Sequence, residues 1–252
     1  MLILRVYIIG MGVYWKGIIY SAVIDPMLSS LRRSVVDRVT SDDRVIDIAC
    51  GPGTLAMDIA LRAQSVTAID IEEDLISYAS QRADKKGITN ISFRALDASD
   101  LSCFADNEFD VAVTSMAIHQ FEPELAVKIL AEMKRIASRV SVADYNCPMK
   151  PGVFRSLAYG IERLAGGDHY RNFRNYMRVG GMDFFAAEAG LVIVSAEIRG
   201  KGVLKIAEMG PREIAQGSGL RAKKRSQGKA KGDRAGWQVY LWREKPNNAE
   251  SG

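Results

Sequence analysis

The segment from Arg44 to Ala60, RVIDIACGPGTLAMDIA, constrains the fold of this chain more than any other stretch. A run of β-branched and apolar residues reaches Asp47, a turn of small residues follows, and the chain continues with apolar residues at helical spacing. A buried strand that leads directly into a helix is the first half of a β-α-β unit and predicts a parallel sheet. Gly51 and Gly53 in the turn tolerate positive φ and allow a ligand to lie against the main chain.

The same alternation of Val- and Ile-rich runs with helical segments continues along the chain. We expect strands at 44–49, 65–70, 91–97, 109–116 and 139–145, and helices at 24–39 (capped by Asp25), 54–63, 74–86 and 123–137. Helices are also expected at 154–166 and 182–190, on either side of a polar and aromatic segment, and a hairpin at 191–209 around a Gly-Lys-Gly turn. The predicted fold is α/β: a Rossmann-like, doubly wound, mostly parallel seven-stranded sheet with a C-terminal antiparallel hairpin.

Charge divides the chain into parts. The 252 residues are 48% hydrophobic and 25% charged, as in an ordinary globular protein with one large domain. The net charge is +4, but residues 210–252 hold ten Lys/Arg and four Asp/Glu, so this segment carries +6 and the preceding residues carry −2. We therefore expect an N-terminal arm or cap at 1–24, a main domain at 25–209 and a basic, flexible tail at 210–252.

The apolar N-terminus and the cysteines bear on where the protein works. The stretch MLILRVYIIGMGVYW is interrupted by Arg5, which leaves ten uninterrupted residues at 6–15. A spanning helix needs about 20 residues, so no stable membrane insertion is expected, while packing on the domain and peripheral membrane contact both stay open. Cys50, Cys103 and Cys147 are widely spaced, which predicts neither disulfides nor a structural metal site and favours the cytoplasm.

Two carboxylates follow the next strands of the predicted sheet. Asp70 ends the second strand and Asp97 the third. The carboxyl ends of parallel strands share one edge, where doubly wound sheets bind their ligands. Asp70 can accept hydrogen bonds from both hydroxyls of a ribose, and Asp97 or its neighbouring amides can contact the edge of an adenine. Taken singly, an acid at such a place is more often a helix cap or part of a solvated loop, and GPGTLA also fits the dinucleotide pattern GxGxxA.

Four strings taken together, VIDIACGPGTLA, VTAIDIEEDLI, ISFRALDASDL and FDVAVTSMAIHQF, are typical of one family. Residues 19–208 resemble class I S-adenosylmethionine-dependent methyltransferases, especially the small-molecule group around the ubiquinone and menaquinone methyltransferases. The resemblance implies that the turn holds the methionine half of S-adenosylmethionine, that the acid after the second strand holds the ribose and that the third loop contacts adenine. The cofactor-binding positions it implies are Asp47, Ala49, Gly51, Gly53, Asp70, Ile71, Asp97, Ala98, Ser115, Met116 and Tyr20.

The chain departs from the family pattern at two of these places. Ala49 stands where the family has its first glycine, which changes how closely the backbone can approach a ligand there. Ser21 replaces the acid that relatives carry after the tyrosine matched by Tyr20. An aromatic face at Tyr20 would suit a sulfonium through a cation–π interaction, and a role in the core explains the residue equally well.

Methyl transfer from a sulfonium depends mainly on positioning and on the exclusion of water. A general base is needed only when the acceptor atom carries a proton of high pKa. His119, after the fourth strand, is the candidate base, and Asp144 and Tyr145 at the end of the fifth strand face the same site by topology. A structural histidine and strand-end packing are the alternative interpretations of these residues.

The predicted function is methyl transfer from S-adenosylmethionine to a small-molecule acceptor, without a metal and with an apolar acceptor such as a quinone or lipid favoured. Arg171, Arg174 and Arg178 recur at helical spacing and could meet an anionic substrate or form a solvated face. An NAD-linked oxidoreductase shares the architecture but is disfavoured by Asp47 and Asp97. An RNA methyltransferase that uses the basic tail and a non-catalytic cofactor-binding module stay open as alternatives. No pattern predicts a particular oligomeric state.

Overall fold

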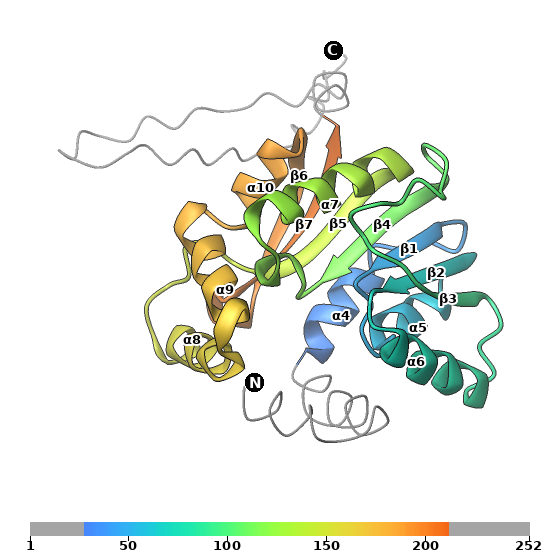
Figure 1. Cartoon of the computed structure of the whole chain (residues 1–252), viewed down its shortest axis with the longest axis horizontal. Helices are drawn as coiled ribbons and strands as arrows, with labels where there is room; N and C mark the ends of the chain where they lie inside the picture. The colour runs from blue at the N-terminus through green and yellow to red at the C-terminus, as the bar shows by residue number, and fades with distance from the viewer. Residues whose placement is uncertain (1–27, 212–252) are drawn as a thin grey trace, which may run out of the picture.

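The computed structural model of this chain describes residues 28–211. The N-terminal arm with Tyr20, the expected cap Asp25 and the basic tail lie outside the described residues. Within 28–211 the chain forms one sheet flanked by helices (Figure 1). No helix in this range is long and apolar enough to cross a membrane.

The five strands expected from the alternation and the two of the expected hairpin are all present, and their ends differ from the expected ones by a few residues. They are β1 Arg44–Ile48, β2 Ser65–Asp70, β3 Ile91–Ala95, β4 Phe109–Ser115, β5 Ala137–Tyr145, β6 Leu191–Arg199 and β7 Leu204–Pro211. The strand order is β3-β2-β1-β4-β5-β7-β6, with parallel pairing from β3 to β5 and antiparallel pairing of β7 with both β5 and β6. The predicted doubly wound sheet with a C-terminal antiparallel hairpin is confirmed. Its strand order reverses between β1 and β4, where such sheets bind ligands.

The helices fill the connections between these strands. They are α4 Ser29–Val36, α5 Thr54–Ala60, α6 Glu73–Lys85, α7 Pro123–Ile136, α8 Val153–Ala165, α9 Gly167–Val179 and α10 Met182–Glu188, with short 3-10 turns η2 Ile118–Gln120 and η3 Gly200–Gly202. The polar and aromatic segment expected between two helices is itself helical and forms α9. Its buried face consists of Asn172, Phe173 and Tyr176, which is too sparse an apolar pattern to predict a helix.

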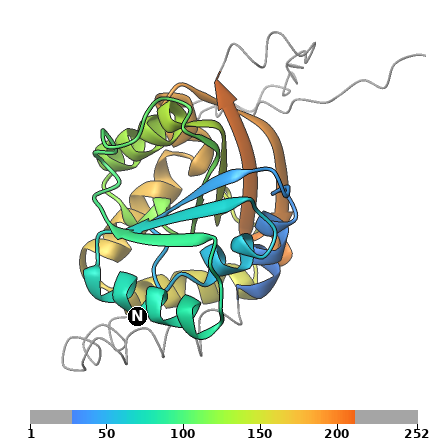
Figure 2. The same cartoon turned by 90° about the vertical axis from the view of Figure 1, so that its right-hand side faces the viewer.

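Helices cover both faces of the sheet (Figure 2). Neighbouring residues of a strand point to opposite faces, so Val45 packs with α4 and α5 while Ile46 packs in the core that includes α7 and α10. Helices α8 and α9 lie at the carboxyl ends of β4 and β5 (Figure 1), where the Asn172 amide donates to the Gln120 carbonyl at 2.8 Å. The Tyr176 hydroxyl donates to the Tyr145 carbonyl at 2.8 Å. These two helices therefore cover one end of the edge at which a ligand is expected.

Candidate functional site

The turn between β1 and α5 uses its two glycines for different reasons. Gly51 has φ +54°, and a Cβ there would meet no atom within 4 Å, so the turn is open on this side. Gly53 has φ +73°, and a Cβ there would lie 2.6 Å from Cε1 of Phe93 and 2.8 Å from Cβ of Ala79. The N–H of Gly53 donates to the Cys50 carbonyl at 3.0 Å. Gly53 thus allows the start of α5 to pack closely against Phe93 and Ala79. The predicted ligand contact at this glycine stays a prediction.

Ala49, which replaces the glycine of the family pattern, has φ +57°. This is the left-handed region, which costs an alanine roughly 1–2 kcal/mol. The chain therefore keeps the backbone shape of the turn despite the extra methyl group. The alanine at this position is therefore accommodated at the cost of local backbone strain.

Asp47 is the buried acid of the site. Its side chain is 1% exposed, and its Oδ2 has no hydrogen-bond partner in the described part of the chain. It lines a cavity of about 50 Å³ together with Ala49, Gly51 and Ser115. The cavity leaves room for a small polar group beside the carboxylate. Burial raises the pKa of Asp47 to about 8, and the charge of Asp70 adds to the shift.

Asp70 lies where the sequence placed it, at the end of β2, and it faces the glycine turn. Its Oδ2 accepts a hydrogen bond from the N–H of Gly51 at 2.7 Å, and its Oδ1 accepts one from the N–H of Glu72 at 3.0 Å. These bonds support the structural interpretation of this carboxylate, and its contact with a ribose stays a prediction. The next residue, Ile71, is an apolar side chain left 68% exposed beside the turn.

The remaining predicted cofactor contacts lie at the ends of β3 and β4. Asp97 is exposed and accepts a hydrogen bond from the N–H of Ser99 at 2.8 Å, which fixes the loop that also carries the partly buried Ala98. Ser115 lines the same cavity as Asp47. Met116 has φ +56°, and its N–H donates to the Ala143 carbonyl of β5 at 2.8 Å. These residues follow one edge of the sheet, as predicted.

The three predicted catalytic residues are brought together, and all three are buried. His119 in η2 is 1% exposed, and its Nδ1 lies 2.6 Å from Oδ1 of Asp144. Oδ2 of Asp144 also accepts the backbone N–H of His119 at 3.2 Å. The Tyr145 ring packs edge-on against the imidazole, with ring centroids 4.8 Å apart. Burial opposes the charged imidazolium, but the charge and hydrogen bond of Asp144 outweigh it and raise the pKa of His119.

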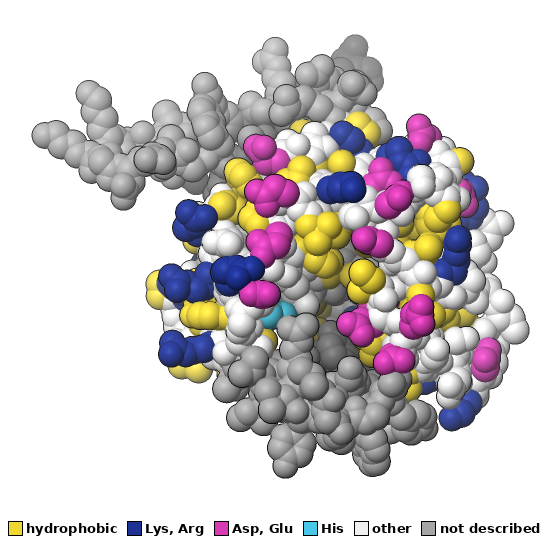
Figure 3. Space-filling model, in the orientation of Figure 1, with side chains coloured by type: hydrophobic (Ala, Val, Ile, Leu, Met, Phe, Trp, Pro, Cys, Tyr) yellow, Lys and Arg dark blue, Asp and Glu magenta, His cyan; other side chains and the backbone are white. Residues whose placement is uncertain are grey.

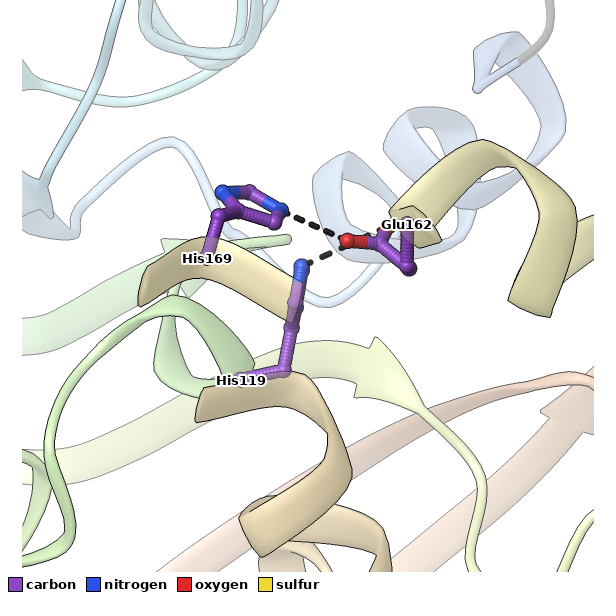
Figure 4. A group of neighbouring side chains, drawn as sticks. All are labelled: His119, Glu162 and His169. Atoms are coloured by element: carbon purple, nitrogen blue, oxygen red, sulfur yellow. Dashed lines mark hydrogen bonds and ion pairs between the residues drawn. The ribbon is translucent and has the colours of Figure 1, made fainter. Parts of the chain in front are cut away.

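Two residues that the sequence did not single out complete this cluster. Glu162 of α8 is 4% exposed, and its Oε1 accepts the Tyr145 hydroxyl at 2.7 Å. Its Oε2 lies 2.6 Å from Nε2 of His169 on α9, while Oε1 lies 3.7 Å from Nε2 of His119. Figure 4 shows the carboxylate between the two imidazoles. Burial raises the pKa of Glu162, but the hydrogen bond from His169 and the charge of His119 outweigh it and lower the pKa.

One signal in the sequence could have identified Glu162. Ala158, Glu162 and Ala165 are buried and follow one another at spacings of four and three residues, so the carboxylate occupies the buried stripe of an amphipathic helix. A charge in such a stripe is rarely buried unless it is paired. His169 offered no comparable signal, because the helix that carries it was not expected.

The arginines of α9 line a groove that shares no lining residue with the cavity beside Asp47. The groove has a volume of about 580 Å³ and is lined by Tyr159, Gly167, Tyr170, Arg171, Arg174, Asn175, Met177 and Arg178. Arg171 pairs with Asp168 and Glu122. The space-filling view shows a group of Lys and Arg side chains on the left, over α8 and α9, while acidic side chains are spread over the upper middle and the right among further Lys and Arg (Figure 3). The groove is therefore both basic and aromatic.

Comparisons with known proteins give one family. The family model for a methyltransferase domain matches residues 39–175. The uncharacterized methyltransferase YcgJ of Bacillus subtilis is 28% identical over 132 residues, which are 52% of this chain and 51% of that relative. The ubiquinone biosynthesis O-methyltransferase of Stutzerimonas stutzeri is 28% identical over 153 residues, which are 60% of this chain and 65% of that relative. The matched part of the chain thus spans between half and two thirds of these relatives.

The crystal structure of magnesium protoporphyrin IX methyltransferase (ChlM) from Synechocystis, with bound SAH, superposes with a TM-score of 0.53 at 18% identity. The superposition covers 74% of this chain and 83% of that protein, and it shows a shared fold. The described site fits S-adenosylmethionine. Asp47 offers a buried carboxylate oxygen that has no partner among the described residues and could pair with a cation. Asp70 lies at the turn, and Ile71 offers an exposed apolar side chain against which adenine could pack. The chain belongs to the class I S-adenosylmethionine-dependent methyltransferases.

Proposed function

We propose that this chain transfers a methyl group from S-adenosylmethionine to a small-molecule acceptor with an apolar or aromatic body. The observation that carries the proposal is Oδ2 of Asp47, a buried carboxylate oxygen that faces a cavity and has no partner among residues 28–211. A buried charge without a partner is costly, and a cationic group removes that cost. The methionine half of S-adenosylmethionine carries an ammonium group that can do so.

The cofactor supplies an electrophilic sulfonium methyl group when it is bound. The chain's own part is to bind and orient the reactants and to keep water out. Asp47 and the turn at Gly51 would hold the amino-acid half of the cofactor. Asp70 would bind the ribose, and Ile71 would pack against the adenine ring. Ser115, at the end of β4, would lie beside the reacting end, because it lines the cavity together with Asp47.

The acceptor side is proposed from the surroundings of α8 and α9. The groove along these helices is lined by Tyr159, Tyr170 and Met177 as well as by arginines. Helix α8 also exposes Val153 and Phe154, which are 79% and 52% accessible. Aromatic and apolar side chains with a few polar groups are typical of small-molecule sites. They support a quinone-like or lipid-like acceptor. An arginine of the groove could form an ion pair with an anionic substituent of that acceptor.

The burial of His119 limits how this residue could act as a general base. Its side chain is 2% exposed, and Glu162 and His169 connect it to the more exposed end of the cluster, where the His169 side chain is 20% exposed. A proton from an acceptor would reach His119 along these two residues. Positioning alone serves an acceptor that is already deprotonated. His119 therefore stays a predicted base for acceptors that carry a proton, as long as its Nε2 has no other ligand, with Asp144 fixing its ring.

Calorimetric titration tests the cofactor half of the proposal. S-adenosylmethionine and S-adenosylhomocysteine should bind and NAD should not. The informative variant is Ile71→Ser, because this side chain is 68% exposed and its loss leaves the fold intact, whereas removing Asp70 also breaks the turn. Leu61→Ser is the matched control, since Leu61 is 78% exposed at the far end of α5. Weaker binding for Ile71→Ser alone supports the site, and preferential binding of NAD would exclude the proposal.

Transfer of a labelled methyl group tests the acceptor half. Hydroxylated quinones, phenolic lipids and short RNAs would be compared under identical conditions with the full chain. Turnover with a small apolar acceptor and none with RNA supports the proposal. Turnover with RNA alone would replace the acceptor by a nucleic acid, and cofactor binding with no turnover on the panel would leave only a cofactor-binding module.

A further inference from the structure

Three metal-ligating side chains converge from three separate elements at the carboxyl ends of β4 and β5. They are His119 of η2, Glu162 of α8 and His169 of α9, and one donor atom from each lies within 4.8 Å of the others (Figure 4). We infer that these residues form a binding site for a divalent transition-metal ion of the Zn²⁺ class. Two imidazoles and one carboxylate form a common ligand set for zinc, with a fourth position left for water or a further ligand.

The distances need only a small adjustment to hold such an ion. Nε2 of His169 lies 2.6 Å from Oε2 of Glu162, and Nε2 of His119 lies 3.7 Å from Oε1. With metal–ligand bonds of about 2.0–2.1 Å, tetrahedral geometry places donor atoms roughly 3.3 Å apart. The two observed separations join different oxygens of Glu162, and within one set of three donors no separation exceeds 4.8 Å. Side-chain shifts of up to about 1.5 Å therefore bring the three donors to tetrahedral spacing.

The groups behind the ligands are arranged as in metal sites. Nδ1 of His119 lies 2.6 Å from the Asp144 carboxylate, which holds the N–H on that side and leaves the Nε2 lone pair facing Glu162. A carboxylate behind a ligating histidine is a common companion of a bound metal. The ligating carboxylate is held in turn, because the Tyr145 hydroxyl donates to Oε1 of Glu162 at 2.7 Å. The side chains of His119 and Glu162 are thus held in place before a metal ion binds.

The charges inside the cluster favour a cation. Asp144 is fully buried and Glu162 is 4% exposed. Within residues 28–211, the ion pairs of these two carboxylates involve only the two histidines and neither lysine nor arginine. Two buried carboxylates facing two imidazoles balance a divalent ion without any protonated histidine. The rings of Tyr145, Phe173 and Tyr176 around His119 keep the surroundings apolar and strengthen this attraction.

One side of the cluster gives an ion a way in. The His169 side chain is 20% exposed, against 5% for Glu162 and 2% for His119. An ion would enter on the His169 side, and its fourth position would open in the same direction. Because its ligands lie on η2, α8 and α9, the ion would also fasten both helices to the end of the sheet.

The experiment uses the full chain, stripped of metal with a chelator and titrated with Zn²⁺ in competition with an indicator. The chain has only two histidines, His119 and His169, so ring NMR of a sample labelled in histidine reports on both ligands directly. We expect one Zn²⁺ per chain and a shift of both ring signals. The affinity should fall by 10- to 100-fold in Asp144→Asn, which removes only the supporting carboxylate. It should fall by more in His169→Gln.

Two controls separate this site from adventitious binding. Glu124→Gln changes an exposed carboxylate near the start of α7, and Cys103→Ser removes an exposed thiol; both should bind Zn²⁺ like the unaltered chain. His169→Gln is the main test, because this partly exposed residue can be changed with the least disturbance of the core. Unaltered binding in His169→Gln, histidine signals that do not respond, or binding lost in Cys103→Ser would each overturn the inference. S-adenosylhomocysteine binding is measured separately and does not decide it.

Discussion

Binding of the cofactor should release a proton from Asp47. Burial, with the charge of Asp70 in addition, raises the pKa of Asp47 to about 8, so about 97% of it is protonated at pH 6.5 in the free protein. Pairing with an ammonium group favours the charged carboxylate and lowers its pKa toward the ordinary 3.8. We therefore expect release of about one proton per bound cofactor at pH 6.5 and an affinity that rises up to about tenfold per pH unit from pH 5.5 to 7.

The assay is calorimetric titration with S-adenosylhomocysteine at pH 6.5 in buffers of different ionisation enthalpy. The slope of observed heat against buffer enthalpy gives the number of protons released. An α-amino group has a pKa of about 7.7–8.0, so the ligand is already protonated at pH 6.5 and contributes nothing. Asp47→Asn should bind more weakly and release no proton. Asp42→Asn, at an exposed position, should behave like the unaltered chain.

Two results would refute this reasoning. Tight binding with the same heat in every buffer would mean that Asp47 is already ionised in the free protein, so that its burial has been offset by another group. Undiminished proton release in Asp47→Asn would locate the titrating group elsewhere along the edge of the sheet. In either case the unpaired Oδ2 would no longer serve as the observation on which the proposed function rests.

Three further predictions concern the same turn. The raised pKa of Asp47 means that, between about pH 4 and 8, the folded chain holds a proton that the unfolded chain has lost. The free energy of unfolding of the cofactor-free protein should therefore fall, relative to that of Asp47→Asn, by about 1.4 kcal/mol per pH unit from pH 5 to 7. Urea titrations measure this difference. Ala49→Gly should stabilise by roughly 0.5–1 kcal/mol in the same assay, because it relieves a positive φ. Gly53→Ala should destabilise by roughly 2–4 kcal/mol, since its Cβ would lie 2.6 Å from the Phe93 ring at a positive φ; a change under about 0.5 kcal/mol would contradict the packing role of this glycine.

The sheet could be predicted because each strand and crossover helix carries its own local pattern. The run from Arg44 to Ala60 shows a buried strand, a turn and a helix without reference to anything distant. The positions of the acids at the carboxyl edge of the sheet could be predicted for a related reason. A residue at the carboxyl end of a parallel strand reaches the ligand edge wherever its strand is placed in the sheet, so Asp47 and Asp70 needed only strand assignments.

The second half of the site depends on how helices dock, which no local pattern specifies. His119 and Asp144 follow neighbouring strands, and the expectation that they meet is consistent with their 2.6 Å contact. Glu162 and His169 reach the same place only because α8 and α9 fold over the ends of β4 and β5. The expectation of a site without metal ligands considered cysteine spacing and did not consider donors spread over three distant segments.

Helix α8 provides a last prediction, because a buried carboxylate is among the groups that hold it. Among its described side chains, Ala158, Glu162 and Ala165 are buried, and Tyr159 packs edge-on against Phe173 of α9. Tyr145→Phe removes the hydroxyl that donates to Glu162 at 2.7 Å. A hydrogen bond to a charged group contributes about 1.5–3 kcal/mol, so amide exchange in α8 should quicken by about tenfold or more in the metal-free protein while α7 is unchanged.

Tyr176→Phe is the matched control, since it removes another buried hydroxyl of the same cluster, one that donates to the Tyr145 carbonyl at 2.8 Å and not to the carboxylate. It should lower the unfolding free energy by about 1 kcal/mol without singling out α8. Faster exchange confined to α8 in Tyr145→Phe would show that this helix opens alone, as the proposed acceptor site beside α8 and α9 would require. Equal exchange in both variants would mean that apolar contacts hold α8, and that Glu162 is buried there for a reason other than anchoring the helix.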